Sequence, residues 1–390
     1  MTRVLPKGWE EKTLGEVCSF NRGLTYKKSD EVSLSSNVVL RANNIDLSTN
    51  SLNFDELKYL SPNFEIPADK KVQKDCLLIC TASGSKSHLG KVALIDKDYG
   101  YAFGGFMGLL LPDKFIDSHY LFYALTSKPY FDFVSHLTDG ANINNLKWSQ
   151  LQDFKLIIPS LPEQKQIVEK LDKIFADIDK AKANTEKNLE NAKEMFRAQL
   201  TEVFNLLKTD GAQVELQNVC AKISAGGDKP AAFSKEPTSR YKIPVYANGE
   251  QNDGLLGFTD VPTISQPAIT VAARGTIGFA CKRMIPYCPI VRLISLIPDT
   301  EKISLDFLFY ALKYLIPTGN GTSIPQLTLP TIRKFRISYP TSLDAQAKVV
   351  EKLNHLQNTT RELEKTYTKT LSILEELKQS VLQQAFSGKL

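Results

Sequence analysis

The 390-residue sequence lacks the short motifs on which several large classes of enzyme depend. It has no Walker A motif, which excludes ATP hydrolysis through a P-loop, and no G-x-G-x-x-G after a predicted strand. Neither an Asn-Pro-Pro-Phe nor an Asp-Pro-Pro-Tyr tetrapeptide for amino-methyl transfer is present. Pro112-Asp113-Lys114 lacks the spacing of a nuclease core, and no Ser/His/Asp grouping can be identified. These absences argue against a catalytic role for the chain.

Cysteine and histidine are also scarce. The six cysteines form neither a C-x-x-C pair nor a dense framework, which is typical of a reducing cytoplasm. His88, His119, His136 and His355 do not have zinc-site spacing, so we predict no metal site. No stretch approaches the roughly 18–20 apolar residues of a membrane span, and the N-terminus lacks the apolar core of a secretory signal. We therefore expect a cytoplasmic protein with no membrane partner.

The charge excess is small. The sequence has 48 Lys and Arg against 43 Asp and Glu, a net charge of +5. Such a charge permits nucleic-acid binding without indicating it. With 42% apolar and 23% charged residues, the composition is that of an ordinary globular protein, and the length fits two or three domains.

An internal repeat organises the chain. The segment 164–171 (QKQIVEKL) returns as 346–353 (QAKVVEKL), 182 positions later. The same offset, without a gap, pairs Lys187 with Lys369, Leu189 with Leu371, Glu194 with Glu376, Leu200 with Leu382 and Phe204 with Phe386. Two segments therefore keep one register over some forty residues, which indicates duplication.

Both repeated segments are predicted to be long helices. Their apolar and small residues recur at alternating steps of four and three, which is coiled-coil spacing. One such stripe alone more often indicates a buried core helix, but two stripes of equal length favour packing of the helices on each other. The stripe residues are Ile167, Leu171, Ile174, Ile178, Ala181, Thr185, Asn188, Ala192 and Met195, and Val349, Leu353, Leu356, Thr360, Leu363, Tyr367, Thr370, Leu374, Leu377 and Val381.

The repeat continues weakly outside the helices. Leu121–Leu125 returns as Leu308–Leu312, and Leu14–Cys18 is echoed by Leu216–Cys220. Short β-branched runs bounded by Gly, Pro, Asn and Asp predict many short strands. We therefore predict an α/β (α+β) fold with two homologous globules, each followed by a long helix. The predicted boundaries are 1–160 and 209–342 for the globules and 161–208 and 343–390 for the helices.

The predicted loops of both globules combine basic residues with side-chain amides. Asn and Gln can bond an adenine edge, and Arg and Lys can address guanine or phosphate. The alternative is that Asn, Gly and Ser serve only as turn formers. Recurrence in both globules favours DNA contact by Arg22, Tyr26, Lys27, Lys28, Arg41, Asn43, Asn44, Ser85, Lys86, Asn142, Asn144, Asn145 and Lys147, and by Asn248, Gln251, Arg274, Thr276, Lys282, Arg283, Asn320 and Thr322.

Four segments carry a resemblance to a known family, namely 5–9 (LPKGW), 158–164 (IPSLPEQ), 273–278 (ARGTIG) and 385–390 (AFSGKL). With them, the chain resembles the specificity (S) subunits of type I restriction–modification systems over nearly its whole length. The first globule further resembles the recognition domains of the enterobacterial K-type systems. That likeness rests on the segments 22–28 (RGLTYKK), 40–45 (LRANNI), 83–87 (SGSKS) and 140–145 (GANINN).

The resemblance implies a division of labour. Each globule would read one half of a split double-stranded DNA sequence, and the helices would pair antiparallel with pseudo-twofold symmetry. Two modification (M) subunits would hold S-adenosylmethionine and methylate adenine. Two restriction (R) subunits would use ATP and Mg²⁺ for cleavage, and this chain would hold no cofactor. The alternatives are a stand-alone DNA methyltransferase or nuclease, and a coiled-coil adaptor without a nucleic-acid role.

Overall fold

The computed structural model describes residues 5–138, 145–210, 213–316 and 326–390. The chain divides into two compact units, each with its own hydrophobic core. Unit 1 comprises 1–184 and 370–390, and unit 2 comprises 185–369. Each unit therefore contains one of the predicted globules together with parts of both long helices.

The globule of unit 1 is a mixed α/β structure with two four-stranded sheets. Its strands are β1 (Glu10–Thr13), β2 (Cys18–Arg22), β3 (Glu31–Val32), β4 (Asn37–Leu40), β5 (Lys58–Leu60), β6 (Leu77–Cys80), β7 (Val92–Leu94), β8 (Ala102–Phe103), β9 (Met107–Pro112) and β10 (Lys155–Ile158). Its helices are α1 (Leu14–Val17), α2 (Ser118–Ala124), α3 (Lys128–Thr138) and α4 (Trp148–Leu151), with the 3-10 turns η2 (Ala42–Asn44) and η4 (Lys86–His88) in the loops. The sheets have the orders β2-β9-β6-β7 and β3-β5-β4-β8, and β1 pairs with β10.

The globule of unit 2 has a similar set of elements. Its strands are β11 (Val214–Glu215), β12 (Cys220–Ala225), β13 (Ile243–Tyr246), β14 (Leu255–Thr259), β15 (Ala268–Val271), β16 (Ala280–Arg283), β17 (Cys288–Pro289), β18 (Ile294–Pro298) and β19 (Arg336–Ile337). Its helices are α6 (Leu305–Leu315) and α7 (Leu329–Arg333), with the 3-10 turn η6 (Gln251–Gly254). The sheets have the orders β12-β18-β15-β16 and β14-β13-β17, and β11 pairs with β19.

Most strands of the two globules correspond. The sheet β2-β9-β6-β7 matches β12-β18-β15-β16, and the parallel pair β4/β8 matches β13/β17. In each globule the same backbone hydrogen bond joins the residue just after the first strand to the residue just before the last strand. Leu14 N donates to Phe154 O and Leu216 N donates to Phe335 O, both at 2.8 Å. The predicted duplication of the globule is confirmed.

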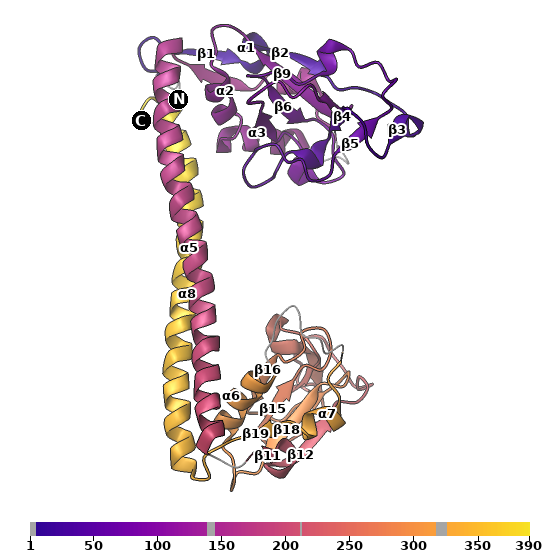
Figure 1. Ribbon diagram of the computed structural model, residues 1–390, viewed down its shortest axis with the longest axis vertical. Helices are drawn as coiled ribbons and strands as arrows, with labels where there is room; N and C mark the ends of the chain where they lie inside the picture. Colours follow the sequence, from indigo (N-terminus) through magenta and orange to yellow (C-terminus); the bar gives the residue numbers. More distant parts are fainter. Residues whose placement is uncertain (1–4, 139–144, 211–212, 317–325) are drawn as a thin grey trace. The chain divides into compact units, whose positions relative to one another are not determined.

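The long helices are α5 (Leu161–Asp210) and α8 (Leu343–Ala385), and each passes from one unit into the other. In unit 1 the beginning of α5 lies beside the end of α8, where Lys170 Nζ donates to Leu390 O at 3.1 Å (Figure 1). In unit 2 the end of α5, with Phe204, shares a core with the beginning of α8, with Leu353. The helices are therefore antiparallel, as predicted. No helix among the described residues is long and apolar enough to cross a membrane.

The predicted helical stripe is correct at most positions and wrong at three. Ile167, Leu171 and Leu353 are buried as predicted, but Asn188 is exposed, and Met195 and Leu377 are 40% and 44% exposed. A helix with 3.6 residues per turn drifts away from a strict 3.5-residue repeat, so one stripe cannot stay buried along a whole long helix. Ala192 is buried as predicted, but further along α5 the buried residues are Leu200, Val203 and Phe204, which lie outside the predicted stripe.

Candidate nucleic-acid interface

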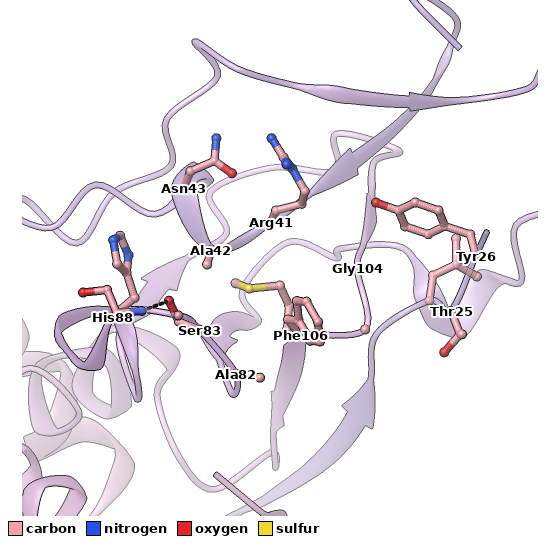
Figure 2. A pocket seen from close by; sticks show the side chains of 15 residues that line it. Thr25, Tyr26, Arg41, Ala42, Asn43, Ala82, Ser83, His88, Gly104 and Phe106 are labelled. Carbon is pink, nitrogen blue, oxygen red and sulfur yellow. Dashed lines mark hydrogen bonds between the residues drawn. The ribbon is translucent and has the colours of Figure 1, made fainter. Parts of the chain in front are cut away.

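A cavity of about 710 Å³ opens where four loops of unit 1 converge. It is lined by the segment after β2, the end of β4 with η2, the β6–β7 loop and the β8–β9 turn. Figure 2 shows Tyr26, Arg41, Asn43, His88 and Phe106 arranged around it. The two sheets end at this place, which explains why loops distant in sequence meet here.

Asn44 shapes the entrance to this cavity from inside the protein. Its Oδ1 accepts a hydrogen bond from Arg41 N at 2.8 Å, and its Nδ2 donates to Asn53 O at 2.9 Å. The side chain is fully buried, so the predicted DNA contact of Asn44 is corrected to a positioning role. By closing η2, Asn44 directs Arg41 and the exposed Asn43 toward the cavity.

Two polar atoms at the cavity are buried without a hydrogen-bond partner among the described residues. They are Arg41 Nε and His88 Nδ1. Buried polar atoms of this kind are rare, because leaving one unpaired costs about 1–3 kcal/mol. These two atoms are therefore unsatisfied among the described residues. His88 was not predicted, since nothing in its sequence context distinguishes it from a surface histidine.

Most of the other predicted residues of the first globule lie on its surface. Burial raises the pKa of half-buried Tyr26, so its hydroxyl stays protonated and able to donate. Asn145 forms a bridge with Ala82 at the cavity rim. Asn142 and Asn144 lie outside the described residues. The exposed residues of this group are Arg22, Lys27, Lys28, Ser85, Lys86, Asn145 and Lys147.

Unit 2 carries a corresponding face. Leu327 N donates to Ala273 O at 3.0 Å, as Leu146 N donates to Thr81 O at 2.7 Å in unit 1. The β15–β16 loop with Arg274 and Thr276, both exposed, therefore corresponds to the β6–β7 loop. Beside α7 lies a cavity of about 380 Å³, which was not predicted. Its lining consists of Ala225, Gly226, Arg292, Ile294, Gln326, Leu327, Thr328, Leu329 and Pro330.

Three predicted contacts of unit 2 are side chains that the structure uses internally. Arg283 is 6% exposed, and its guanidinium lies 3.6 Å from the Tyr246 ring centre and donates to Asp253 O at 2.6 Å. Lys282 is ion-paired with Asp306 of α6. Asn248 uses both halves of its amide, donating to Val291 O and accepting from Ala273 N, each at 2.8 Å. Arg283 is buried, so its predicted DNA contact is corrected to a supporting role. Lys282 and Asn248 are partly exposed, and their DNA contacts stay predictions.

The remaining predicted residues of unit 2 are Gln251, which is exposed in η6, and Asn320 and Thr322, which lie outside the described residues. Among the described residues, no group of three His, Cys, Asp or Glu side chains could hold a metal ion.

Comparison with known proteins agrees with this duplicated architecture. The family model described as type I restriction modification DNA specificity domain matches residues 6–191 and again 210–372. The chain belongs to this specificity family. It is the DNA sequence-recognition subunit of a type I restriction–modification system, with one recognition domain in each unit and no catalytic role of its own.

Members of the family are similar to this chain over different lengths. The StySPI specificity subunit of Salmonella potsdam is 26% identical, covering 99% of this chain and 90% of its own. The EcoKI specificity subunit of Escherichia coli K12 is 35% identical over 185 residues, 47% of this chain and 39% of its own, which supports the predicted K-type resemblance.

Solved structures show the same fold. A chain from a study of type I restriction–modification complex assembly and conformational transition has a TM-score of 0.83 at 20% identity, covering 99% of this chain and all of that one. The HsdS subunit of Thermoanaerobacter tengcongensis has a TM-score of 0.60 at 20% identity, covering 99% and 98%.

Proposed function

We propose that the face around the 710 Å³ cavity reads one half of a split DNA sequence and that the corresponding face of unit 2 reads the other. The observation that carries this proposal is that one framework presents different side chains in the two units. Ser85 and Lys86 are exposed in the β6–β7 loop of the first face, and Arg274 and Thr276 are exposed in the corresponding β15–β16 loop of the second. A repeated framework with changed surface residues is what two different half-sites require.

The chemistry of the first face suits DNA. Arg41 and Asn43 offer the donors and acceptors that match guanine and adenine edges in the major groove. The exposed lysines Lys27, Lys28 and Lys86 lie on neighbouring loops, where they can contact phosphates and position the domain. The net charge of the whole chain is small, but positively charged side chains are available on the face that DNA would approach.

The helices α5 and α8 would set the spacer between the half-sites. Each runs without a break from one unit into the other, so we expect the number of their residues to control the separation of the half-sites. Inserting seven residues after Asn184 and seven after Lys369 preserves the coiled-coil phase and adds about 10 Å to each helix. We expect a longer spacer, by about three base pairs, with both half-sites unchanged.

The remaining partners follow from the type I division of labour. We infer that two modification subunits with S-adenosylmethionine bind the chain and methylate an adenine in each half-site. Two restriction subunits with ATP and Mg²⁺ complete the nuclease in the cytoplasm. Mass photometry of the co-expressed subunits measures both numbers.

The proposal is tested by long-read methylation mapping in cells that express the chain with its modification subunit. Arg41→Ala/Asn43→Ala is expected to relax or abolish one half-site, and Arg274→Ala/Thr276→Ala the other. Lys155→Ala, at an exposed position of β10 and outside the loops that line the two cavities, is the control and should leave the map unchanged. If either face variant altered both halves equally, or neither, the assignment of one face to each half-site would be wrong.

A further inference from the structure

One turn is built in the same way in both units. In unit 1, Met107 N donates to Gly104 O at 2.8 Å, and in unit 2, Leu293 N donates to Ile290 O at 3.0 Å. The two central residues of the turn are thus Gly105 and Phe106 in unit 1. In unit 2 they are Val291 and Arg292.

A glycine holds each turn against the neighbouring strand. Gly23 N donates to Met107 O at 3.1 Å, and Gly226 N donates to Leu293 O at 2.8 Å. A Cβ atom on Gly23 would lie 1.9 Å from Gly104 O, and one on Gly226 would lie 2.5 Å from the carbonyl carbon of Pro289. Only glycine permits so close an approach. The turns are therefore fixed platforms rather than loose loop tips.

In unit 1 this platform exposes an aromatic ring. Phe106 is 70% exposed, although phenylalanine is usually buried. Its backbone is held firmly, because Phe106 O accepts hydrogen bonds from Thr81 N at 2.9 Å, Ala82 N at 3.0 Å and Thr81 Oγ1 at 3.0 Å. The ring lies at the cavity that also contains Arg41 and Asn43 (Figure 2).

In unit 2 the same platform exposes a guanidinium. Arg292 is exposed and lines the 380 Å³ cavity. Val291 and Arg292 have φ angles of 53° and 60°, in the left-handed region. A β-branched residue is rarely found there, and strain of this kind tends to occur where function requires a particular geometry.

We propose that this turn enters the DNA in both half-sites but acts differently in each. Phe106 inserts between two base pairs of the first half-site and unstacks them, whereas Arg292 bonds a guanine edge in the second half-site without unstacking it. This inference rests on the proposed assignment of one half-site to each face. Apolar wedges that unstack a base step kink the duplex, and pyrimidine–purine steps yield most easily. One half-site would therefore be read partly through its deformability and the other through hydrogen bonds.

The test uses the complex of the full chain with its modification subunits, bound to duplexes that carry the mapped sequence. 2-Aminopurine, which fluoresces more strongly when it is unstacked, replaces single purines outside the target adenines. We expect a rise at one step of the first half-site and at none of the second. 2-Aminopurine at each target adenine, which must leave the stack for methylation, is the positive control.

Substitutions then assign the effect to the ring. Phe106→Ala should lower the fluorescence at that step to the level of the free duplex, and Phe106→Tyr should retain the rise. Phe54→Ala, at a ring of unit 1 that is 38% exposed, is the matched control. An undiminished rise in Phe106→Ala would overturn the wedge while leaving the function intact. The wedge would also be overturned if Phe106→Ala failed to assemble with the modification subunits in the absence of DNA, because the ring would then be a protein contact.

Arg292 is tested by discrimination at single base pairs. Both Arg292→Ala and Arg292→Lys should lose at least about five-fold preference for guanine at one position of the second half-site, since lysine cannot form the bidentate pair. Wild-type discrimination by the lysine variant would show a phosphate contact only and would overturn this half of the proposal. If the wild-type complex methylated no two-part sequence at all, the proposed function itself would fail.

Discussion

Gln164 and Gln346 make the same three hydrogen bonds in the two units. Gln164 accepts from Asp117 N at 2.8 Å and donates to Phe115 O at 3.1 Å and Pro159 O at 2.9 Å. Gln346 accepts from Ser304 N at 2.9 Å and donates to Lys302 O at 2.8 Å and Pro340 O at 2.9 Å.

Both glutamine side chains are fully buried where a long helix meets its globule. Asp117 caps α2 and Ser304 caps α6, so each glutamine binds the start of the corresponding short helix. In each unit this interaction therefore joins the recognition domain to the long helix that follows it.

Replacement of either glutamine should weaken its own unit. Gln164→Leu removes the partner of backbone groups of Phe115, Asp117 and Pro159, the last of them buried, and we expect unit 1 to lose about 1–3 kcal/mol of stability. Gln346→Leu should do the same to unit 2. Hydrogen exchange resolved by segment measures each effect separately. Gln166→Leu, at an exposed position of α5, is the control. A loss of stability in this control as large as that in Gln164→Leu would contradict this interpretation. So would a loss that either glutamine variant spreads equally over both units.

Arg41 and Asn44 are adjacent in the fold but should respond differently to substitution. Arg41→Ala is expected to reduce affinity for the mapped duplex by about 1–3 kcal/mol with little change in thermal stability. Asn44→Ala removes the bonds to Arg41 N and Asn53 O, so it should lower stability by about 1–3 kcal/mol as well as binding. Fluorescence anisotropy at a fixed salt concentration and thermal melting separate the two quantities. Equal melting temperatures for the two variants would argue against the positioning role of Asn44.

The left-handed conformation of Val291 should cost stability. Asparagine tolerates this region much better, and relief of about 1 kcal/mol would raise the melting temperature by about 2–4 °C. We therefore expect Val291→Asn to stabilise unit 2. Val261→Asn, at a valine that is 67% exposed, is the matched control and should not stabilise. A melting temperature that stayed constant or fell in Val291→Asn would show that the turn is unstrained.

Lys313 should make the stability of unit 2 depend on pH. Burial, followed by the nearby Arg361, lowers the pKa of Lys313 to about 8. Between about pH 8 and the ordinary value of 10.5, the unfolded chain binds the proton that the folded chain has released, so this group makes stability rise with pH. The gain in wild-type melting temperature over this range should shrink in Lys313→Gln and persist in Lys235→Gln. Parallel curves for wild type and Lys313→Gln would contradict this expectation.

The sequence predicts the helices and the duplication well because both leave local or periodic marks. The residues from Gln164 and Gln346 onward carry the repeat, and α5 and α8 begin at the predicted residues Leu161 and Leu343. Strand pairing could not be predicted, because β1 pairs with β10 some 140 positions away and no local pattern encodes that register. The drift that exposes Asn188 and Met195 depends on how the helices twist around each other.

The site was predicted at the level of loops but not of individual side chains. Arg41 and Asn44 lie three residues apart with the same polar character, yet one lines the cavity and the other is buried. Phe106 lies in an apolar stretch that reads as core, and its exposure depends on the contact of Gly23 with the turn. Arg292 is recognised only because its turn matches that of Phe106 in the folded structure.

The central claim is that each globule reads one half-site independently while the helices set the spacing. It is tested most directly by a chain in which residues 209–342 are replaced by a second copy of residues 1–160, expressed with the modification subunit and mapped by long-read methylation sequencing. Because α5 and α8 are antiparallel, we predict an inverted repeat of the first half-site with about the original spacer. Retention of the original asymmetric sequence, or loss of all methylation in a complex that still assembles, would contradict the claim.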